Sequence, residues 1–103
     1  MPTYVMLSTL GPDGAARLHE NPQRLYEVSA EVEAMGVTVR EQYALLGQWD
    51  FLNIIDAPDD VTVARVATTL AARGTVKTLT LPAIDVDTFV AGLTSGRQDG
   101  RTD

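Results

Sequence analysis

Two hydrophobic periods alternate along the chain. Apolar and β-branched residues bounded by Gly, Pro and Asp predict four strands, at residues 3–9, 37–46, 51–56 and 75–82. Two longer stretches carry apolar residues at spacings of three and four and predict amphipathic helices, at residues 21–36 and 59–73. A helical turn within residues 11–20 and a short last helix over residues 85–93 complete the expected elements.

The ends of the two long predicted helices carry residues that favour helix termini. Asn21 can cap the first helix, and Gly36 suits the left-handed position after its last turn. Asp59 or Asp60 can cap the second helix, and Gly74 can end it. The resulting order, βαββαβ, predicts an α+β, ferredoxin-like fold: a four-stranded antiparallel sheet with both helices on one face.

The first strand is apolar on both of its alternating faces, whereas a strand covered on one side alternates apolar with polar residues. Helices can cover only one face of the predicted sheet. We expect the other face to carry Tyr4, Met6, Phe51 and Ile55, or a similar apolar set. Soluble monomers rarely expose an apolar patch of that size, so we expect the chain to partner itself as a homodimer through this open face.

Length and composition fit a single domain. The chain has 103 residues, of which 45% are hydrophobic, an ordinary fraction for a globular protein. We expect one domain over residues 1–94. Residues 95–103, SGRQDGRTD, are polar and rich in Gly, and they predict a flexible tail.

The charge and the missing residue types exclude several partners and cofactors. The formal net charge is −6, which repels phosphates and anionic lipids, so we expect neither nucleic acid nor a membrane as a partner. The chain has no cysteine and one histidine, so it offers no thiolate or multi-histidine site. We therefore expect no metal site and no cofactor. The absence of cysteine fits a cytoplasmic protein.

One stretch carries a family resemblance. The run YALLGQWDFLNIIDAPDD, together with MPTYVMLSTL and RGTVKTLTLPAI, resembles the GYD-domain family of small bacterial proteins over about residues 1–90. The naming turn of that family is Gly-x-Tyr-Asp. Here the turn is Gly47-Gln48-Trp49-Asp50, with tryptophan in place of tyrosine. The resemblance implies a dimeric α/β barrel. The wider fold group includes cofactor-free monooxygenases, haem-degrading enzymes, isomerases, stress-response proteins and metal binders, so the fold does not select an activity.

The turn at residues 47–50 has a structural and a functional interpretation. In the structural one, Gly47 supplies a tight connection, Asp50 accepts backbone N–H groups within the turn, and Trp49 covers the end of the sheet. In the functional one, Trp49 forms the wall of a pocket and Asp50 acts as a base or a polar anchor. Short turns with Gly and Asp are common between strands, which favours the structural interpretation.

A few polar residues among apolar neighbours are further candidates. Asn53 lies in the middle of a strand, where its amide can bond to Tyr43, Ser8 or water, or can anchor a ligand. Tyr4 and Tyr43 are first expected to be amphipathic residues of the barrel and second ligand contacts. The candidate ligand-binding residues are Tyr4, Tyr43, Trp49 and Asn53.

The candidate catalytic residues are Asp50, His19 and Tyr43. Histidine is the commonest general acid or base, but His19 precedes a helix start in a polar stretch, where a surface position is the simpler interpretation. No nucleophile elbow is present in the sequence. The acidic residues that follow the third predicted strand match no calcium loop, and helix capping accounts for them better.

Three functions fit these features. The first is a homodimeric protein that binds a small molecule or serves as an accessory protein, with a mostly apolar pocket between the sheet and its partner or helices. The second is a cofactor-independent monooxygenase or isomerase that acts on a small apolar or aromatic metabolite. The third is a purely structural oligomer. A cavity large enough for an aromatic ring, lined by Asn53 and Tyr43, would favour the first two.

Overall fold

The structure, a computed structural model, describes residues 1–98, which form four strands and four helices. In chain order these are β1 (Thr3–Leu10), α1 (Pro12–Glu20), α2 (Arg24–Ala34), β2 (Thr38–Ala44), β3 (Phe51–Asp56), α3 (Asp60–Ala72), β4 (Val76–Ala83) and α4 (Val86–Gln98). All four predicted strands and both long predicted helices are present.

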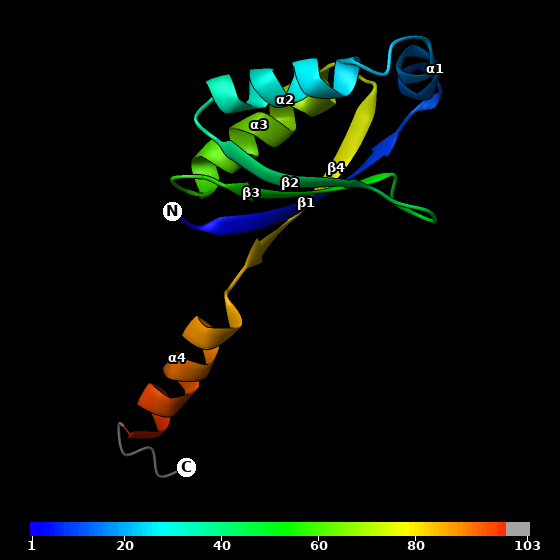
Figure 1. Cartoon of the computed structure of the whole chain (residues 1–103). Helices are drawn as coiled ribbons and strands as arrows, with labels where there is room; N and C mark the ends of the chain where they lie inside the picture. Colours follow the sequence, from blue (N-terminus) through cyan, green and yellow to red (C-terminus); the bar gives the residue numbers. More distant parts are fainter. Residues whose placement is uncertain (99–103) are drawn as a thin grey trace.

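The four strands form one antiparallel sheet in the order β2-β3-β1-β4. Strand β1 lies in the middle and pairs with both β3 and β4. Helices α2 and α3 lie side by side across one face of the sheet, and α1 lies at one end of it (Figure 1). This is the predicted α+β, ferredoxin-like fold, and the prediction is confirmed.

The helix ends show which of the predicted caps form. Asp59 caps α3, because its Oδ1 accepts the backbone N–H of the third residue along at 2.9 Å. Gly36 and Gly74 follow α2 and α3 with φ angles of 101° and 74°, the left-handed region that favours glycine. Asn21 does not cap α2, since it ends α1, and α2 begins after a further turn.

Helix α1 is longer than the single turn that the sequence predicts, and it packs tightly on the start of β4. Pro12 occupies its first turn, where a missing N–H is tolerated. The N–H of Gly11 donates to the carbonyl oxygen of Thr75 at 3.0 Å. A Cβ atom at Gly14 would lie 2.5 Å from that same oxygen, so only glycine allows this approach.

Both faces of the sheet are apolar, as predicted, but the assignment of residues to the two faces was wrong. Tyr4, Met6 and Ile55 are only 2–4% exposed and lie in the core beneath the helices, not on the open face. Phe51 shares the helix-covered face, because it lies opposite the buried Ser8. Because both alternating sets are apolar, the period of two did not reveal which set the helices cover.

The other set forms a face that no helix in the described part of the chain covers. We call it the open sheet face; its apolar residues are Val5, Leu7, Leu52, Ile54, Leu79 and Leu81. Leu79 and Leu81 are 42% and 46% exposed. The sheet therefore has an apolar surface on each side, and the chain's own helices bury one of them.

A β-bulge changes the faces of the edge strand β2. Simple alternation predicts that Val39 and Glu41 share a face. The register instead pairs Val39 with Ile55 and Glu41 with Ile54, so Arg40 between them has no opposite residue in the β3 register, although its side chain lies 3.6 Å from Asp56 of that strand. As a result Val39 packs against the core, while Glu41 lies on the open sheet face.

Helix α4 continues beyond β4 and points away from the rest of the molecule (Figure 1). The described chain extends 59 × 29 × 20 Å, and its radius of gyration is 16.9 Å, against about 13 Å for a compact chain of this length. The apolar residues Val86, Phe89, Val90 and Leu93 recur at spacings of three and four along α4, and each is at least half exposed. Helix α4 thus presents an apolar stripe to solvent.

The tail predicted for residues 95–103 falls partly within this helix. Helix α4 runs to Gln98, well past the short helix expected from the sequence. Residues 99–103 lie outside the described residues. None of the helices in the described part is both long enough and apolar enough to cross a membrane.

Two valines of α3 should differ sharply in how much their truncation to alanine lowers the free energy of unfolding. Val66 is fully buried and Val61 is 76% exposed. We expect Val66→Ala to lower the free energy of unfolding by roughly 1.5–3 kcal/mol, from lost apolar burial and the cavity that remains. The matched control Val61→Ala should change it by less than about 0.5 kcal/mol. Urea denaturation followed by circular dichroism measures both, and equal effects would contradict the core described here.

Candidate functional site

A cavity of about 620 Å³ lies between the helix-covered face of the sheet and the helices above it. We call it the helix-side cavity. Met6, Phe51 and Asn53 of the sheet contribute to its floor, and Leu18 of α1 and Leu25 of α2 contribute to its roof. Its volume lies within the range of about 300–1,000 Å³ that is usual for small-molecule sites. The walls are predominantly apolar.

Asn53 is the conspicuous polar residue of the floor. It lies on β3 opposite Met6 of β1 and Gln42 of β2. Its Oδ1 atom is buried and has no hydrogen-bond partner among the described residues. A buried carbonyl without a donor is costly, so the site favours a bound group that supplies an N–H or an O–H.

Three arginines border the cavity: Arg17 of α1, Arg24 of α2 and Arg73 at the end of α3. The residues that line the cavity, all within the described part of the chain, include no Asp or Glu. The chain as a whole has 14 acidic and 8 basic residues. The charged residues of the lining are therefore all arginines, and the carboxylates of Glu27 and Glu31 that pair with two of them lie outside the lining.

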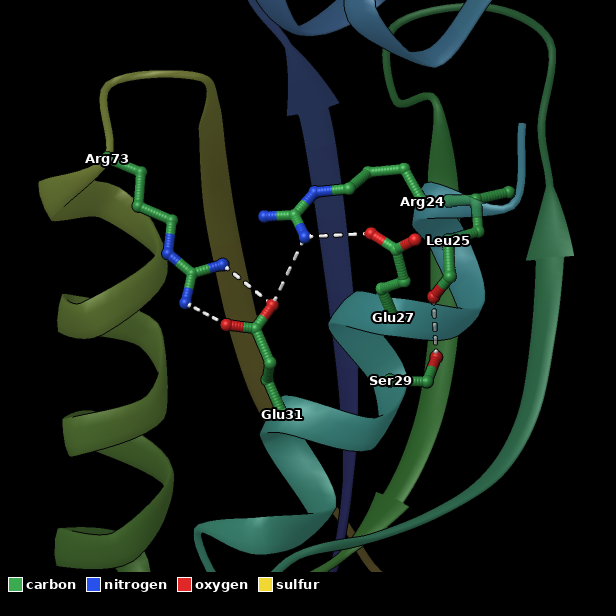
Figure 2. Close-up of polar contacts among 6 residues, drawn as sticks. All are labelled: Arg24, Leu25, Glu27, Ser29, Glu31 and Arg73. Carbon is green, nitrogen blue, oxygen red and sulfur yellow. Dashed lines mark hydrogen bonds and ion pairs between the residues drawn. The ribbon is translucent and has the colours of Figure 1, made fainter. Parts of the chain in front are cut away.

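Glu31 joins two of these arginines and ties α2 to α3 (Figure 2). Its carboxylate accepts hydrogen bonds from Nη2 of Arg73 at 2.6 Å and from Nη1 of Arg73 at 3.2 Å. It also lies 3.6 Å from Nη1 of Arg24, which contacts Glu27 Oε1 at 3.1 Å. The hydrogen bonds from Arg73 hold the pKa of Glu31 below its ordinary value of 4.5. These ion pairs hold α2 against the end of α3, and they hold Arg24 and Arg73 at the border of the cavity.

The turn between β2 and β3 has a structural role. Gly47 has a φ of 112°, which favours glycine. Oδ2 of Asp50 accepts the backbone N–H of Leu10 at 2.7 Å. The backbone N–H of Asp50 donates to the carbonyl oxygen of Ser8 at 2.8 Å. Asp50 therefore fastens the turn to the end of β1, whereas the sequence led us to expect bonds within the turn itself.

The structure separates the candidate ligand-binding residues. Tyr43 and Asn53 border the helix-side cavity, and Tyr4 and Trp49 do not. Tyr4 lies in the core, 3% exposed, and its hydroxyl donates to Oδ1 of Asp60 at 2.5 Å. This hydrogen bond raises the pKa of Tyr4 to about 12. Trp49 is half-buried in the turn.

The candidate catalytic residues do not form one constellation. His19 is exposed in the last turn of α1 and does not line the cavity. The carboxylate of Asp50 is engaged by β1. Tyr43 borders the cavity, but its side chain lies on the open sheet face opposite Leu52, where its hydroxyl donates to Oε1 of Glu41 at 2.5 Å, which raises the pKa of Tyr43. No group of His, Cys, Asp or Glu in the described residues could hold a metal ion.

Sequence reasoning missed the three arginines. They are far apart in the sequence, and each lies on a helix surface where a charged residue is ordinary. Their common position becomes visible only when α1, α2 and α3 are placed over the sheet. One weak signal was present: the region from residue 14 to residue 24 holds two of the chain's 8 basic residues.

The fold and the cavity define a small α+β, ferredoxin-like domain with space for a ligand beneath its helices. Among solved structures, the chain is similar to the one described as "crystal structure of FFRP-DM1", with a TM-score of 0.58 and 17% identity. That likeness covers 82% of this chain and 100% of the other. At this identity it supports the fold alone.

Two further comparisons give the family. The model of the GYD domain matches residues 4–92. A protein of Thermus thermophilus named "Glutamine synthetase and cystathionine beta-lyase binding protein" is 52% identical over 94 residues, which span 90% of this chain and 99% of that protein. The chain belongs to the GYD-domain family, and the resemblance seen in the sequence is confirmed.

The Glu31 ion pairs predict a pH dependence of stability. Because the pKa of Glu31 is lowered by folding, its contribution is present above about pH 4.5 and is lost as the pH falls through the folded-state pKa. The pair is partly exposed, so we expect Glu31→Gln to cost at most about 1 kcal/mol near pH 7. At low pH, where Glu31 of the native chain is protonated, the cost should vanish.

Urea denaturation of both proteins at neutral and acidic pH measures this difference. Glu20→Gln is the matched control, because Glu20 makes no ion pair within the described residues. A difference between native protein and Glu31→Gln that does not shrink on acidification would contradict the role given to Glu31.

Proposed function

We propose that this protein is a homodimeric accessory protein that binds partner enzymes and holds a small ligand in its helix-side cavity. The observation that carries the accessory role is the similarity to the Thermus thermophilus protein, whose name describes it as binding glutamine synthetase and cystathionine β-lyase. The similarity extends over 99% of that protein, so no additional domain of the relative is needed to explain its binding.

Two apolar surfaces that the described chain leaves uncovered support the proposed homodimer. One is the open sheet face, and the other is the apolar stripe of α4. Helix α4 has 13 residues, a length at which an isolated helix is only marginally stable in water. It needs a packing partner, and the rest of its own chain lies away from it (Figure 1). A second copy supplies both missing contacts.

The sizes of the two surfaces support this arrangement. Four strands about 4.8 Å apart, each with about seven residues rising 3.3 Å, give the open sheet face a flat footprint of roughly 440 Å². Helix α4 adds roughly 200 Å² from a length of about 20 Å and a width of about 10 Å. A stable interface buries about 800 Å² of accessible surface on each partner. The sheet alone is small for this purpose, and the sheet with α4 approaches it.

The cavity lining favours binding over catalysis. The cavity is lined by Asn53 and is large enough for an aromatic ring, which disfavours a purely structural oligomer, whereas the side chain of Tyr43 lies on the open sheet face. Among the described residues, the lining holds no His, Asp, Glu or Lys, and tyrosine is the one general acid or base type that it contains.

A binding assay with purified proteins tests the accessory role. The full chain is immobilised, and glutamine synthetase and cystathionine β-lyase of Thermus thermophilus are passed over it separately. We expect binding of at least one enzyme, with a Kd in the micromolar range or below. The Thermus relative serves as the positive control. If the relative binds both enzymes and this chain binds neither, the accessory role proposed for this chain fails.

Light scattering after size-exclusion chromatography tests the dimer. We expect a mass twice the 11.1 kDa of the chain. Leu79→Glu places a charge on the open sheet face and should shift the mass to that of one chain, with circular dichroism confirming that it is folded. Val61→Glu makes the same change at an exposed position of α3 and should leave the dimer intact. A native protein with the mass of a single chain at micromolar concentration would contradict the dimer.

A further inference from the structure

The helix-side cavity has a charge opposite to that of the protein. Three of the chain's 8 basic residues border it, and no acidic residue of the described part of the chain does. Glu27 and Glu31 offset the charges of Arg24 and Arg73 from outside the lining, so Arg17 is left as the positive charge at this apolar opening that no carboxylate within the described residues pairs with. Such a lining attracts an anion and disfavours a cation.

The three arginines differ in how many of their N–H groups already have an acceptor within the chain. Arg73 is engaged by both oxygens of Glu31. Arg24 contacts Glu27 and Glu31 through Nη1 alone, so its other N–H groups remain able to donate. Arg17 makes no ion pair or side-chain hydrogen bond within the part of the chain that the structure describes. Arg17 and Arg24 are the donors available to a bound anion.

The floor of the cavity favours a hydrogen-bond donor on the ligand rather than an anionic group. Oδ1 of Asn53 is a buried acceptor without a donor. A ligand that places an N–H or an O–H there gains a hydrogen bond and removes the cost of the unpaired carbonyl. Leu10, Leu18, Leu25 and Phe51 line the space around these polar groups, and they suit an aromatic or branched aliphatic body.

We propose that the helix-side cavity binds a small amphipathic anion. Its carboxylate, or an anionic group of similar size, pairs with Arg17 and Arg24, its apolar body fills the space beneath α1 and α2, and an N–H or O–H donates to Oδ1 of Asn53. This inference rests on the proposed function, because it names the chemical class of the ligand held in that same cavity.

A pair of fluorescent probes tests the proposal on the full chain. Toluidinonaphthalene sulfonate has an apolar body, a secondary amine N–H and one anionic group. Its sulfonate-free analogue, tolylnaphthylamine, differs by the anionic group alone. We expect Arg17→Ala to weaken binding of the sulfonate probe about five- to tenfold, because a charge-assisted hydrogen bond is lost. Binding of the neutral probe should weaken less than about twofold. Arg40→Ala is the matched control, because Arg40 lies on β2 and does not line the cavity.

Asn53→Leu separates a ligand contact from a structural amide. It removes the unpaired buried acceptor, so we expect the melting temperature to stay level or rise. It also removes the partner of the probe's N–H, so both probes should weaken by a few-fold. A lower melting temperature with unchanged probe affinity would assign Asn53 a structural role and overturn its place in the proposal.

The substitution Ala44→Trp tests whether the probes bind in the helix-side cavity. Ala44 borders the cavity on the edge strand β2, and a tryptophan there fills the space, so it should abolish binding of both probes. If Ala44→Trp blocks both probes but Arg17→Ala weakens them equally, the cavity binds ligands without preferring anions, and this inference fails while the proposed function stands. If neither probe responds to Ala44→Trp, the cavity holds no ligand, and the pocket in the proposed function fails with it.

Discussion

The arrangement of this molecule depends on a four-stranded sheet that is apolar on both faces. Burying one face against α2 and α3 gives the chain its core, with Ile55 and Val66 fully enclosed. Of the other two helices in the described residues, α1 lies at one end of the sheet and α4 lies beyond it, and neither covers the second face (Figure 1). The apolar surface that remains is the physical reason to expect a second copy, because water penalises exposed apolar area roughly in proportion to its size.

The helices that bury the first face also create the cavity. Gly14 allows α1 to approach the start of β4, and Glu31 holds α2 against the end of α3. These contacts leave space between the helices and the floor at Asn53. The same ion pairs that join the helices bring Arg24 and Arg73 to the cavity. Structural stability and the charge of the proposed ligand site therefore share residues, so changes at Glu31 should affect both.

The sequence predicted the fold well because hydrophobic period and breaker residues determine strands and helices locally. The sequence did not determine which of the two alternating sets of strand residues faces the helices. Tyr4 and Met6 differ from Val5 and Leu7 in no property that selects core over open face, and that choice depends on which side the helices cross. The bulge at Arg40 also exchanges the faces on which the later residues of β2 lie. A count of alternating residues cannot detect such a bulge.

The candidate site was predictable only in part. Asn53 was found because a lone amide among apolar strand residues is unusual, and the sheet places it at the cavity floor. Asp50 and Tyr4 were attractive for their chemistry, but each is engaged by a neighbour that is distant in sequence, at Leu10 and Asp60 respectively. Those long-range contacts, like the convergence of the arginines, exist only after folding.

Hydrogen–deuterium exchange of the α4 backbone amides across a dilution series reports whether a second copy covers this helix. We expect slow exchange at concentrations where the protein is dimeric, because a second copy packs on the apolar stripe of α4. We expect fast exchange after dilution to single chains, because an isolated helix of 13 residues is marginal in water. Fast exchange at every concentration, or protection that does not depend on concentration, would contradict this expectation.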